Sequence, residues 1–337
     1  MAATDTASSL TQYVTKIEAG AYVTAAAFLG RTPVLALGDG QVVLAEIGQE
    51  KRIAAHPDAG ILSAAKGPRT LVTGGDDGRV VEIAANGTVT EIAKEKTGWI
   101  DALAVRDDGS ISWASGKTVR ARSAKGEVKS IAAPSTVRGL AFLSKGYRLA
   151  MAHYNGASLW FPNTDAGLDL YEWKGSHLDV TLSPDGRFLV TSMQENALHG
   201  WRLSDKQNMR MSGYPAKSRS LSWSSDGHWL ATSGADACIV WPFKEKTGPM
   251  NKAPHECGVR ESRVSQVAFH PKALVIAVGY DDGWILLCRL TDAAELLVHR
   301  PGETPEGAIT ALTWDADGRH LLFGSAEGFA GLLTMPT

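Results

Sequence analysis

The stretch Trp223–Trp241 reads WSSDGHWLATSGADACIVW, and its order of residue types decides how the whole chain folds. A short apolar segment leads into the turn dipeptide Asp226-Gly227, and a second apolar segment follows. A run of small and polar residues then precedes a third apolar segment. Apolar segments separated by Asp-Gly and small-residue turns predict antiparallel strands joined by hairpins. Because His228 and Cys238 also lie here, the stretch is either a binding site or one copy of a repeat.

The same order of segments recurs along the chain, so the repeat interpretation holds. Further copies occupy residues 23–47, 61–83, 100–123, 137–160, 180–201, 267–290 and 312–333. The second turns of the eight copies fall at Gly40, Gly78, Gly116, Gly156, Asn196, Ala237, Gly283 and Gly328. Neighbouring turns in this series are 38 to 46 residues apart. Eight units of this length are expected for four-stranded propeller blades.

The fold class predicted from these units is all-β, a single eight-bladed propeller of four-stranded antiparallel blades. Most units are followed by a fourth apolar segment, such as EKRIAA or ELLVHR, but the chain stops soon after the eighth. The segment TQYVTKIE at residues 11–18 has the length and alternation of the missing strand. We expect it to pair into the last blade, because closure removes the exposed edges of an open array. The domain division is a disordered tail at residues 1–11 and a propeller at residues 12–337.

These residues resemble the WD-repeat β-propeller family over about residues 12–335. The marks of the family are the turns LSPDG, SSDG and DADG and the tryptophans Trp160, Trp201 and Trp241. The family's buried His, Ser/Thr and Asp positions are matched in spacing by His56, Thr73 and either Asp76 or Asp77. In that unit Ile83 replaces the tryptophan, and no unit ends in Trp-Asp. The repeats are therefore degenerate, which leaves seven blades as the alternative.

The bulk composition excludes several classes of partner. The formal net charge is −2 and basic residues are dispersed, which argues against nucleic acid. No apolar run approaches the roughly 18 residues of a membrane helix, and the first residues lack the apolar core of a secretory signal. Three cysteines without a CxxC pair suit a reducing compartment. We expect a monomer located in the cytoplasm, with no nucleic-acid or membrane partner.

The sequence contains no catalytic motif, so we expect a non-enzyme. No GxSxG elbow and no GxxxxGK[ST] phosphate loop are present. The aspartates recur at one place in the repeat, which is typical of residues that cap their own turns. A propeller hydrolase or lactonase is an alternative that would need carboxylates converging in the channel.

A metal site is the second alternative, and it rests on His255 and Cys257 in the longest connection between units. Imidazole and thiolate suit zinc, although a structural zinc site usually has four ligands. His153, next to a predicted turn, and His177, at the start of a predicted strand, could reach the same face of a propeller. The main expectation is that no cofactor is bound, with zinc as the alternative.

The main functional prediction is a non-catalytic scaffold that binds a partner protein or peptide on the channel face. Three aromatic, two basic and one acidic residue are predicted on this rim, from counting along the inner strands, from the turns between second and third strands, and from the residue before the third inner strand. They are Trp99, Asp101, Arg138, Tyr154, Arg219 and Tyr280. Aromatic residues and arginine are enriched in protein-recognition surfaces. The resemblance also implies this role, since the face commonly grips a peptide or partner domain in related propellers.

Overall fold

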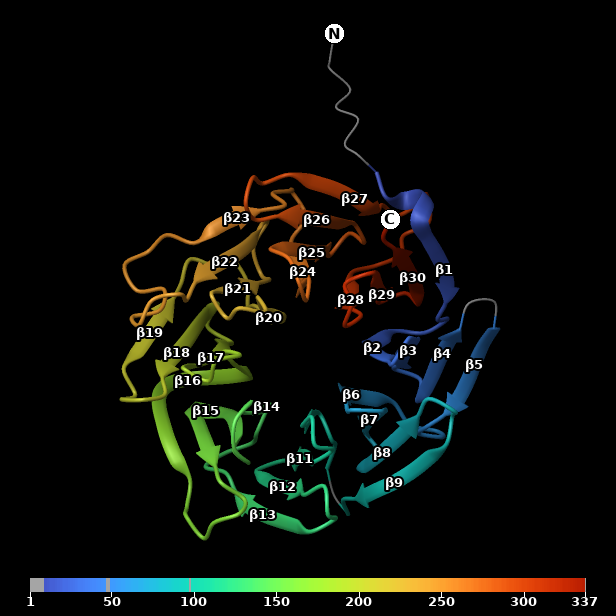
Figure 1. The fold of residues 1–337 in the computed structure, drawn as a ribbon. Coiled ribbons are helices and arrows are strands. Elements are labelled where there is room, and N and C mark those ends of the chain that lie inside the picture. Colours follow the sequence, from blue (N-terminus) through green and yellow to red (C-terminus); the bar gives the residue numbers. More distant parts are fainter. Residues whose placement is uncertain (1–8, 47–48, 97, 337) are drawn as a thin grey trace.

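The chain forms a ring of antiparallel β-sheets around a central opening (Figure 1). The structure is a computed structural model that describes residues 9–46, 49–96 and 98–336. A short 3-10 helix, η1 (Thr11–Tyr13), precedes the first strand. In each sheet of four consecutive strands the first strand lies nearest the opening and the last lies at the outer edge, whereas in the sheet that closes the ring the N-terminal strand lies at the outer edge (Figure 1).

The strands of the first half of the ring are bounded as follows. They are β1 (Val14–Glu18); β2 (Val23–Leu29), β3 (Thr32–Leu37), β4 (Gln41–Glu46) and β5 (Gln49–Ala54); β6 (Ile61–Lys66), β7 (Thr70–Gly75), β8 (Arg79–Ala84) and β9 (Val89–Lys94); β10 (Ala102–Val105), β11 (Ile111–Ser115), β12 (Thr118–Arg122) and β13 (Val128–Ala132); and β14 (Gly139–Phe142) and β15 (Leu149–Trp160).

The remaining strands complete the ring. They are β16 (Asp169–Leu182), β17 (Phe188–Met193), β18 (Ala197–Arg202) and β19 (Asn208–Met211); β20 (Leu221–Trp223), β21 (Trp229–Thr232), β22 (Cys238–Pro242) and β23 (His255–Cys257); β24 (Val264–Phe269), β25 (Val275–Tyr280), β26 (Ile285–Arg289) and β27 (Glu295–His299); and β28 (Ile309–Trp314), β29 (His320–Ser325) and β30 (Phe329–Thr334).

The number of separate sheets differs from the main prediction. Within residues 9–46, 49–96 and 98–336 there are seven hydrogen-bonded sheets, six of four strands and one of six. Counting each sheet as one blade gives seven, the stated alternative, and the expectation of eight separate blades is wrong. The six-stranded sheet, β14 to β19, contains both the fourth and the fifth repeat units.

Two long strands explain this fusion. His153 and Ser158 on β15 are joined by a 2.6 Å hydrogen bond between Nε2 and Oγ, so the chain reverses between them. An extended strand would separate residues five apart by about 16 Å. β16 then runs without interruption from the outer edge of one unit to the inner edge of the next, bending near Gly175, whose φ is 136°. Its first part pairs with β15 and its second with β17, which joins the two units into one sheet.

The N-terminal strand closes the ring, as the sequence predicted. β1 pairs antiparallel with β30 in a register that runs from Val14 opposite Leu333 to Glu18 opposite Phe329. The preceding tail was assigned too long, because Leu10 is buried and its N–H donates to the carbonyl of Leu297 at 2.7 Å. Residues 1–8 of the expected tail lie outside the described residues.

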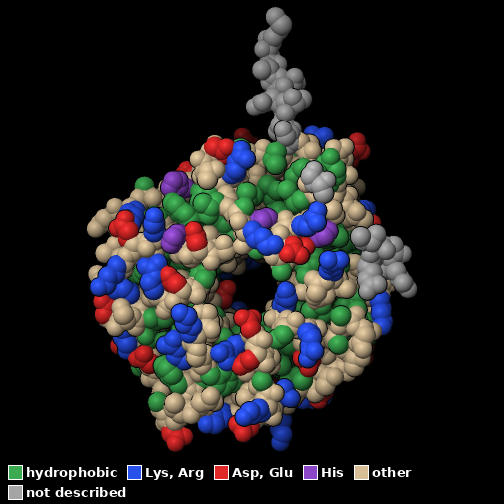
Figure 2. Space-filling model, viewed as in Figure 1, with side chains coloured by type: hydrophobic (Ala, Val, Ile, Leu, Met, Phe, Trp, Pro, Cys, Tyr) green, Lys and Arg blue, Asp and Glu red, His purple; other side chains and the backbone are tan. Residues whose placement is uncertain are grey.

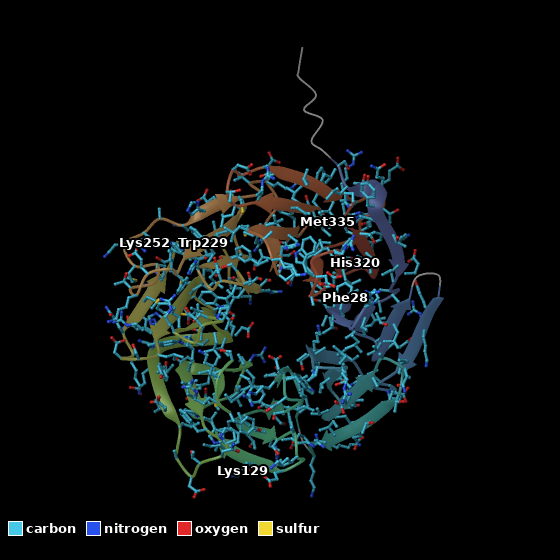
Figure 3. The ribbon with its side chains drawn as sticks, viewed as in Figure 1. Phe28, Lys129, Trp229, Lys252, His320 and Met335 are labelled. Carbon is cyan, nitrogen blue, oxygen red and sulfur yellow. The ribbon has the colours of Figure 1, made fainter. Side chains whose placement is uncertain are left out.

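The hydrophobic core lies between neighbouring layers of the ring rather than at one centre. One cluster packs Ile17 and Phe28 against Leu332, so the closing strand contributes to the contact between the last and first sheets. Another packs Tyr171 against Trp201 within the six-stranded sheet, whose two halves face each other. Side chains fill these spaces, and Lys129 projects from the outer edge (Figure 3). Among the residues that the structure describes, no helix is long and apolar enough to cross a membrane.

The acidic turn residues cap their turns, as expected from their recurrence. Asp185 Oδ1 accepts the N–H of Arg187, and Asp226 Oδ1 accepts the N–H of His228, both at 3.0 Å. Carboxylates used in this way hold hairpin geometry.

Candidate functional site

Buried polar residues link the strands within individual sheets, and the first set confirms a sequence match. His56 lies 3.1 Å from both carboxylate oxygens of Asp77 through Nδ1 and 2.9 Å from Thr73 Oγ1 through Nε2. Since a carboxylate only accepts, Nδ1–H donates to Asp77 and Nε2 accepts from the Thr73 hydroxyl. Asp77 is therefore the residue that matches the family's acid, and Asp76 instead accepts the N–H of Gly60. This histidine is structural.

A tyrosine takes the corresponding place in the sheet that contains the opening stretch. The indole N–H of Trp241 donates to Tyr214 Oη at 2.6 Å, and Tyr214 Oη lies 2.6 Å from Thr232 Oγ1. Thr232 also donates to the carbonyl of Ile239 on the next strand. All three side chains are buried, so the network ties the connection before β20 to β21 and β22.

Replacing Tyr214 by phenylalanine is expected to lower the free energy of unfolding by about 1–3 kcal/mol, because it leaves a buried indole N–H without an acceptor. Urea titration followed by tryptophan fluorescence measures the change. Tyr13→Phe is the control, since Tyr13 is 40% exposed. Equal stability of the two variants would contradict a role for this network.

Two of the three histidines predicted as metal ligands, His153 and His177, are buried and already engaged. His153 Nδ1 donates to the carbonyl of Tyr154 at 2.9 Å, and Nε2 contacts Ser158. His177 Nε2 donates to the carbonyl of Trp173 at 2.9 Å, and Nδ1 lies 2.7 Å from Thr191 Oγ1. Burial lowers the pKa of both rings. Each neutral ring uses one nitrogen as donor and the other as acceptor, so both serve the hydrogen bonding of the sheet.

His255 and Cys257 lie on β23, the outermost strand of their sheet, and not in an irregular loop as expected. Cys257 is buried opposite Cys238 in the strand register, and Cys288 of the next sheet belongs to the same core cluster. A hydrogen bond with Cys257, together with burial, raises the pKa of the Cys238 thiol. Sequence reasoning missed this cluster of three thiols, because the cysteines are spread over fifty residues without a pair motif.

The four predicted ligands are not gathered in one place. His255 and Cys257 belong to the sheet of β20 to β23, whereas His153 and His177 belong to the six-stranded sheet. Within the described ranges, no group of three or more His, Cys, Asp or Glu side chains is arranged to hold a metal ion.

Four of the predicted rim residues form one group. Trp99 is 65% exposed and Tyr154 is 56% exposed, so both rings are available to a partner. Arg138 and Asp101 form an ion pair with 2.5 Å between Nη1 and Oδ2. The Arg138 backbone N–H donates to the carbonyl of Ala152, which places this pair beside the start of β14.

Tyr280 does not belong to the rim, and that part of the prediction is wrong. Its side chain is fully buried, and its hydroxyl donates to the carbonyl of Gly258. The ring lies in the core cluster between β22 and β26, where the guanidinium carbon of Arg260 is 5.3 Å from its centroid. Tyr280 is the last residue of β25, and its side chain points into the core and not toward solvent.

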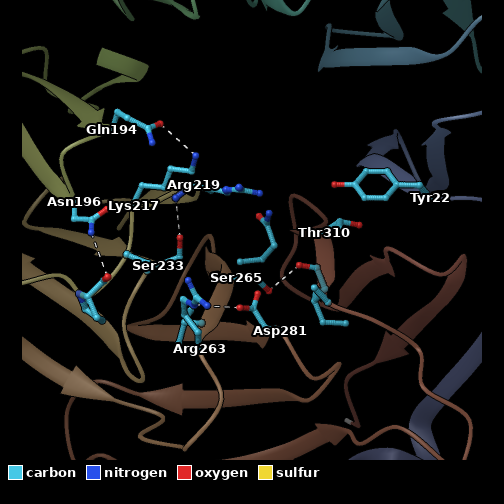
Figure 4. Close-up of a pocket in the computed structure, with 17 residues that line it drawn as sticks. Tyr22, Gln194, Asn196, Lys217, Arg219, Ser233, Arg263, Ser265, Asp281 and Thr310 are labelled. Carbon is cyan, nitrogen blue, oxygen red and sulfur yellow. Dashed lines mark hydrogen bonds and ion pairs between the residues drawn. The ribbon is translucent and has the colours of Figure 1, made fainter. Parts of the chain in front are cut away.

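Arg219 lies in a separate cavity of about 500 Å³ at the central opening (Figure 4). The cavity is lined by residues on or next to the strands of five sheets, and three of these residues are basic: Lys217, Arg219 and Arg263. Asp281 is the acidic residue of the lining, and its Oδ2 lies 3.2 Å from Arg263 Nε. Figure 2 shows basic and acidic side chains around the mouth of the opening.

Of the four charged residues of this cavity, sequence reasoning placed only Arg219 on the rim. Lys217 and Arg263 precede inner strands of two neighbouring sheets, and Tyr22 precedes that of a third. A signal was present, because Tyr22 and Arg263 directly precede their inner strands and Lys217 lies four residues before β20. Their convergence depends on closure of the ring, which brings residue 22 beside residues 217 and 263.

Comparisons with known proteins agree with the repeat pattern. The family model described as WD domain, G-beta repeat matches residues 206–241, which include the opening stretch and Tyr214. Over 154 residues the chain is 26% identical to Cilia- and flagella-associated protein 57 of Mus musculus, covering 45% of this chain and 12% of that protein. It is 24% identical over 154 residues to Transcription initiation factor TFIID subunit 5 of Caenorhabditis elegans, covering 46% and 23%. The aligned segment thus spans less than a quarter of either relative.

A solved structure shares the fold across nearly the whole ring. The computationally designed Ika8 protein matches with a TM-score of 0.77, covering 94% of this chain and 98% of the designed one. The sequences are 16% identical, so the likeness concerns the fold alone.

Proposed function

We propose that this chain, a WD-repeat β-propeller, is a non-catalytic scaffold that binds a partner protein or peptide on its channel face without a cofactor. One relative is by its name a subunit of a transcription initiation factor, which is consistent with propellers of this family working inside assemblies. Fold alone does not assign function, so the proposal rests on the rim.

The observation that carries the proposal is the exposure of aromatic and charged side chains at the inner strand ends. Trp99 and Tyr154 are large rings that would normally be buried, yet more than half of each is exposed. Arg219 adds a cation with no hydrogen bond or ion pair from its side chain to any residue in the described ranges. The few residues that carry most of the binding energy in protein interfaces are enriched in tryptophan, tyrosine and arginine.

The histidines, in contrast, support a structural role and not a reactive one. His56, His153 and His177 are buried, and each ring bonds to a hydroxyl of its own sheet. A general base needs access to a substrate proton. The proposal therefore places no chemistry at these residues.

Replacing Arg138 and Arg219 together by glutamine is expected to reduce partner capture at least about tenfold, which is about 1.4 kcal/mol of binding free energy. The tagged chain is purified from its source cells, and co-purifying proteins are measured relative to the tagged chain. Circular dichroism and thermal unfolding should be unchanged, because both side chains are exposed.

Lys129→Gln with Arg210→Gln is the matched control, because these exposed cations lie on the outer strands β13 and β19. This variant should retain the partners. Full retention by the channel-face variant, or equal loss in both variants, would show that binding uses another surface.

A further inference from the structure

We propose that the cavity lined by Lys217, Arg219 and Arg263 binds an anionic side chain of a partner peptide, a carboxylate or a phosphate; this rests on the proposed scaffold function. The charges that meet at this end of the channel set the chemistry of the ligand.

The residues that line the cavity carry more positive than negative charge. Its charged lining residues are Lys217, Arg219, Arg263 and Asp281, a formal excess of two positive charges. The Asp281 carboxylate pairs with Arg263. Lys217 Nζ donates only to a neutral amide oxygen, that of Gln194, at 3.2 Å. The Arg219 guanidinium has no hydrogen-bond or ion-pair partner within residues 9–46, 49–96 and 98–336. Two cations therefore lack a counter-charge from the protein.

The backbone below Arg219 is fixed although its side chain is free. The N–H groups of Arg219 and Ser220 both donate to Ser233 Oγ at 3.0 Å, and Ser233 is buried. In Figure 4 the Arg219 side chain extends into the open space toward Tyr22. A ligand would therefore order one side chain and not a loop, which keeps the entropy lost on binding small.

The remaining polar groups of the cavity are largely used within the protein, so the cations are its available donors. Thr310 Oγ1 donates to the carbonyl of Val23 at 2.6 Å, and Ser265 Oγ donates to the carbonyl of Ile309 at 2.7 Å. Guanidinium presents a planar fork of N–H donors that matches carboxylate and phosphate oxygens. An anionic ligand both accepts from these donors and compensates their charge, whereas a neutral ligand only accepts from them.

The cavity is large enough to hold one peptide side chain together with part of the adjoining residues. About 500 Å³ lies within the range of roughly 300–1,000 Å³ typical of small-ligand sites. Tyr22 is 50% exposed at the far wall and offers a ring for the adjoining residue of a peptide. The other rim group differs, because Arg138 is already neutralised by Asp101.

Fluorescence anisotropy on the full chain tests the proposal with three labelled twelve-residue peptides of one flexible sequence. They carry three glutamates, three phosphoserines or three glutamines at the same positions. We expect the glutamate or the phosphoserine peptide to bind at least about tenfold more tightly than the glutamine peptide, with an affinity that falls as salt rises. The two anionic peptides separate a carboxylate from a phosphate ligand.

Arg219→Glu should weaken binding of the preferred anionic peptide at least about tenfold, and Arg210→Gln, a control at an exposed cation on the outer strand β19, should change it less than about twofold. Equal binding of the glutamine peptide, or an unchanged affinity in Arg219→Glu, would overturn the proposal. Tighter binding of a twelve-nucleotide single-stranded DNA than of either anionic peptide would also overturn it. The scaffold function fails separately, through retention of cellular partners by the Arg138 and Arg219 double variant.

Discussion

A variant that begins at Ala19 is expected to lose at least about 3 kcal/mol of unfolding free energy and to aggregate on size-exclusion chromatography. It lacks β1, the outer strand that pairs with β30 over residues 14–18. Its loss uncovers the edge of β30 and removes Ile17, which is 5% exposed, from the cluster between the last and first sheets. A free edge offers unpaired backbone groups to other molecules.

Ile17→Asp separates the role of the side chain from that of the strand. It should reproduce most of the loss of stability, because it puts a carboxylate into an apolar cluster. Thr15→Ala is the control, since Thr15 lies on the same strand with an exposed side chain. Thermal unfolding of the three variants compares them. If the truncated chain unfolds at the temperature of the parent, ring closure does not depend on β1.

Acidification from pH 7 to pH 5 is expected to destabilise the fold through its buried histidines. Burial lowers the pKa of His56, His153 and His177, and burial followed by the charge of His177 lowers that of His199 to about 3. The unfolded chain binds these protons near pH 6.5 and the folded chain does not, so stability is complete above pH 6.5 and falls below it. Each ring that stays neutral contributes a loss of about 2 kcal/mol over this interval.

His199 provides the sharpest test of this effect. The ring is fully buried and stacks on Trp173 with 3.9 Å between ring centroids. Neither ring nitrogen has a hydrogen-bond partner among the described residues. His199→Phe keeps a planar ring and removes the titrating group, so its loss of stability from pH 7 to pH 5 should be about 2 kcal/mol smaller than that of the parent.

Urea unfolding at pH 7 and at pH 5 gives the loss of stability for each protein. The loss in the variant can be compared with that in the parent even where the two differ in stability at pH 7. Met211→Leu is the control, because Met211 is buried on the neighbouring strand and carries no titrating group. It should keep the pH dependence of the parent. An unchanged dependence in His199→Phe would mean that His199 is protonated in the folded chain.

Much of the ring could be predicted because its signals are local. Alternating apolar segments and Asp-Gly turns repeat with one period, and each unit needs its neighbours to bury its faces. The same local pattern placed β1, and the resemblance to the WD-repeat family pointed by spacing to His56, Thr73 and either Asp76 or Asp77, of which the structure selects Asp77. β23 was missed because three residues, His255–Cys257, are too short to show alternation.

The amino-acid sequence by itself determined the repeat, most of the strands and the closing segment, because each shows as a local pattern of apolar and turn residues. Only the tertiary structure decided that two units share one sheet through β16, that Tyr280 is buried and that Tyr214 bonds Trp241. It also decided that Lys217, Arg219 and Arg263 line one cavity with Tyr22. The cavity brings together residues of different sheets. Closure of the ring, and not spacing along the chain, determines which of these residues meet.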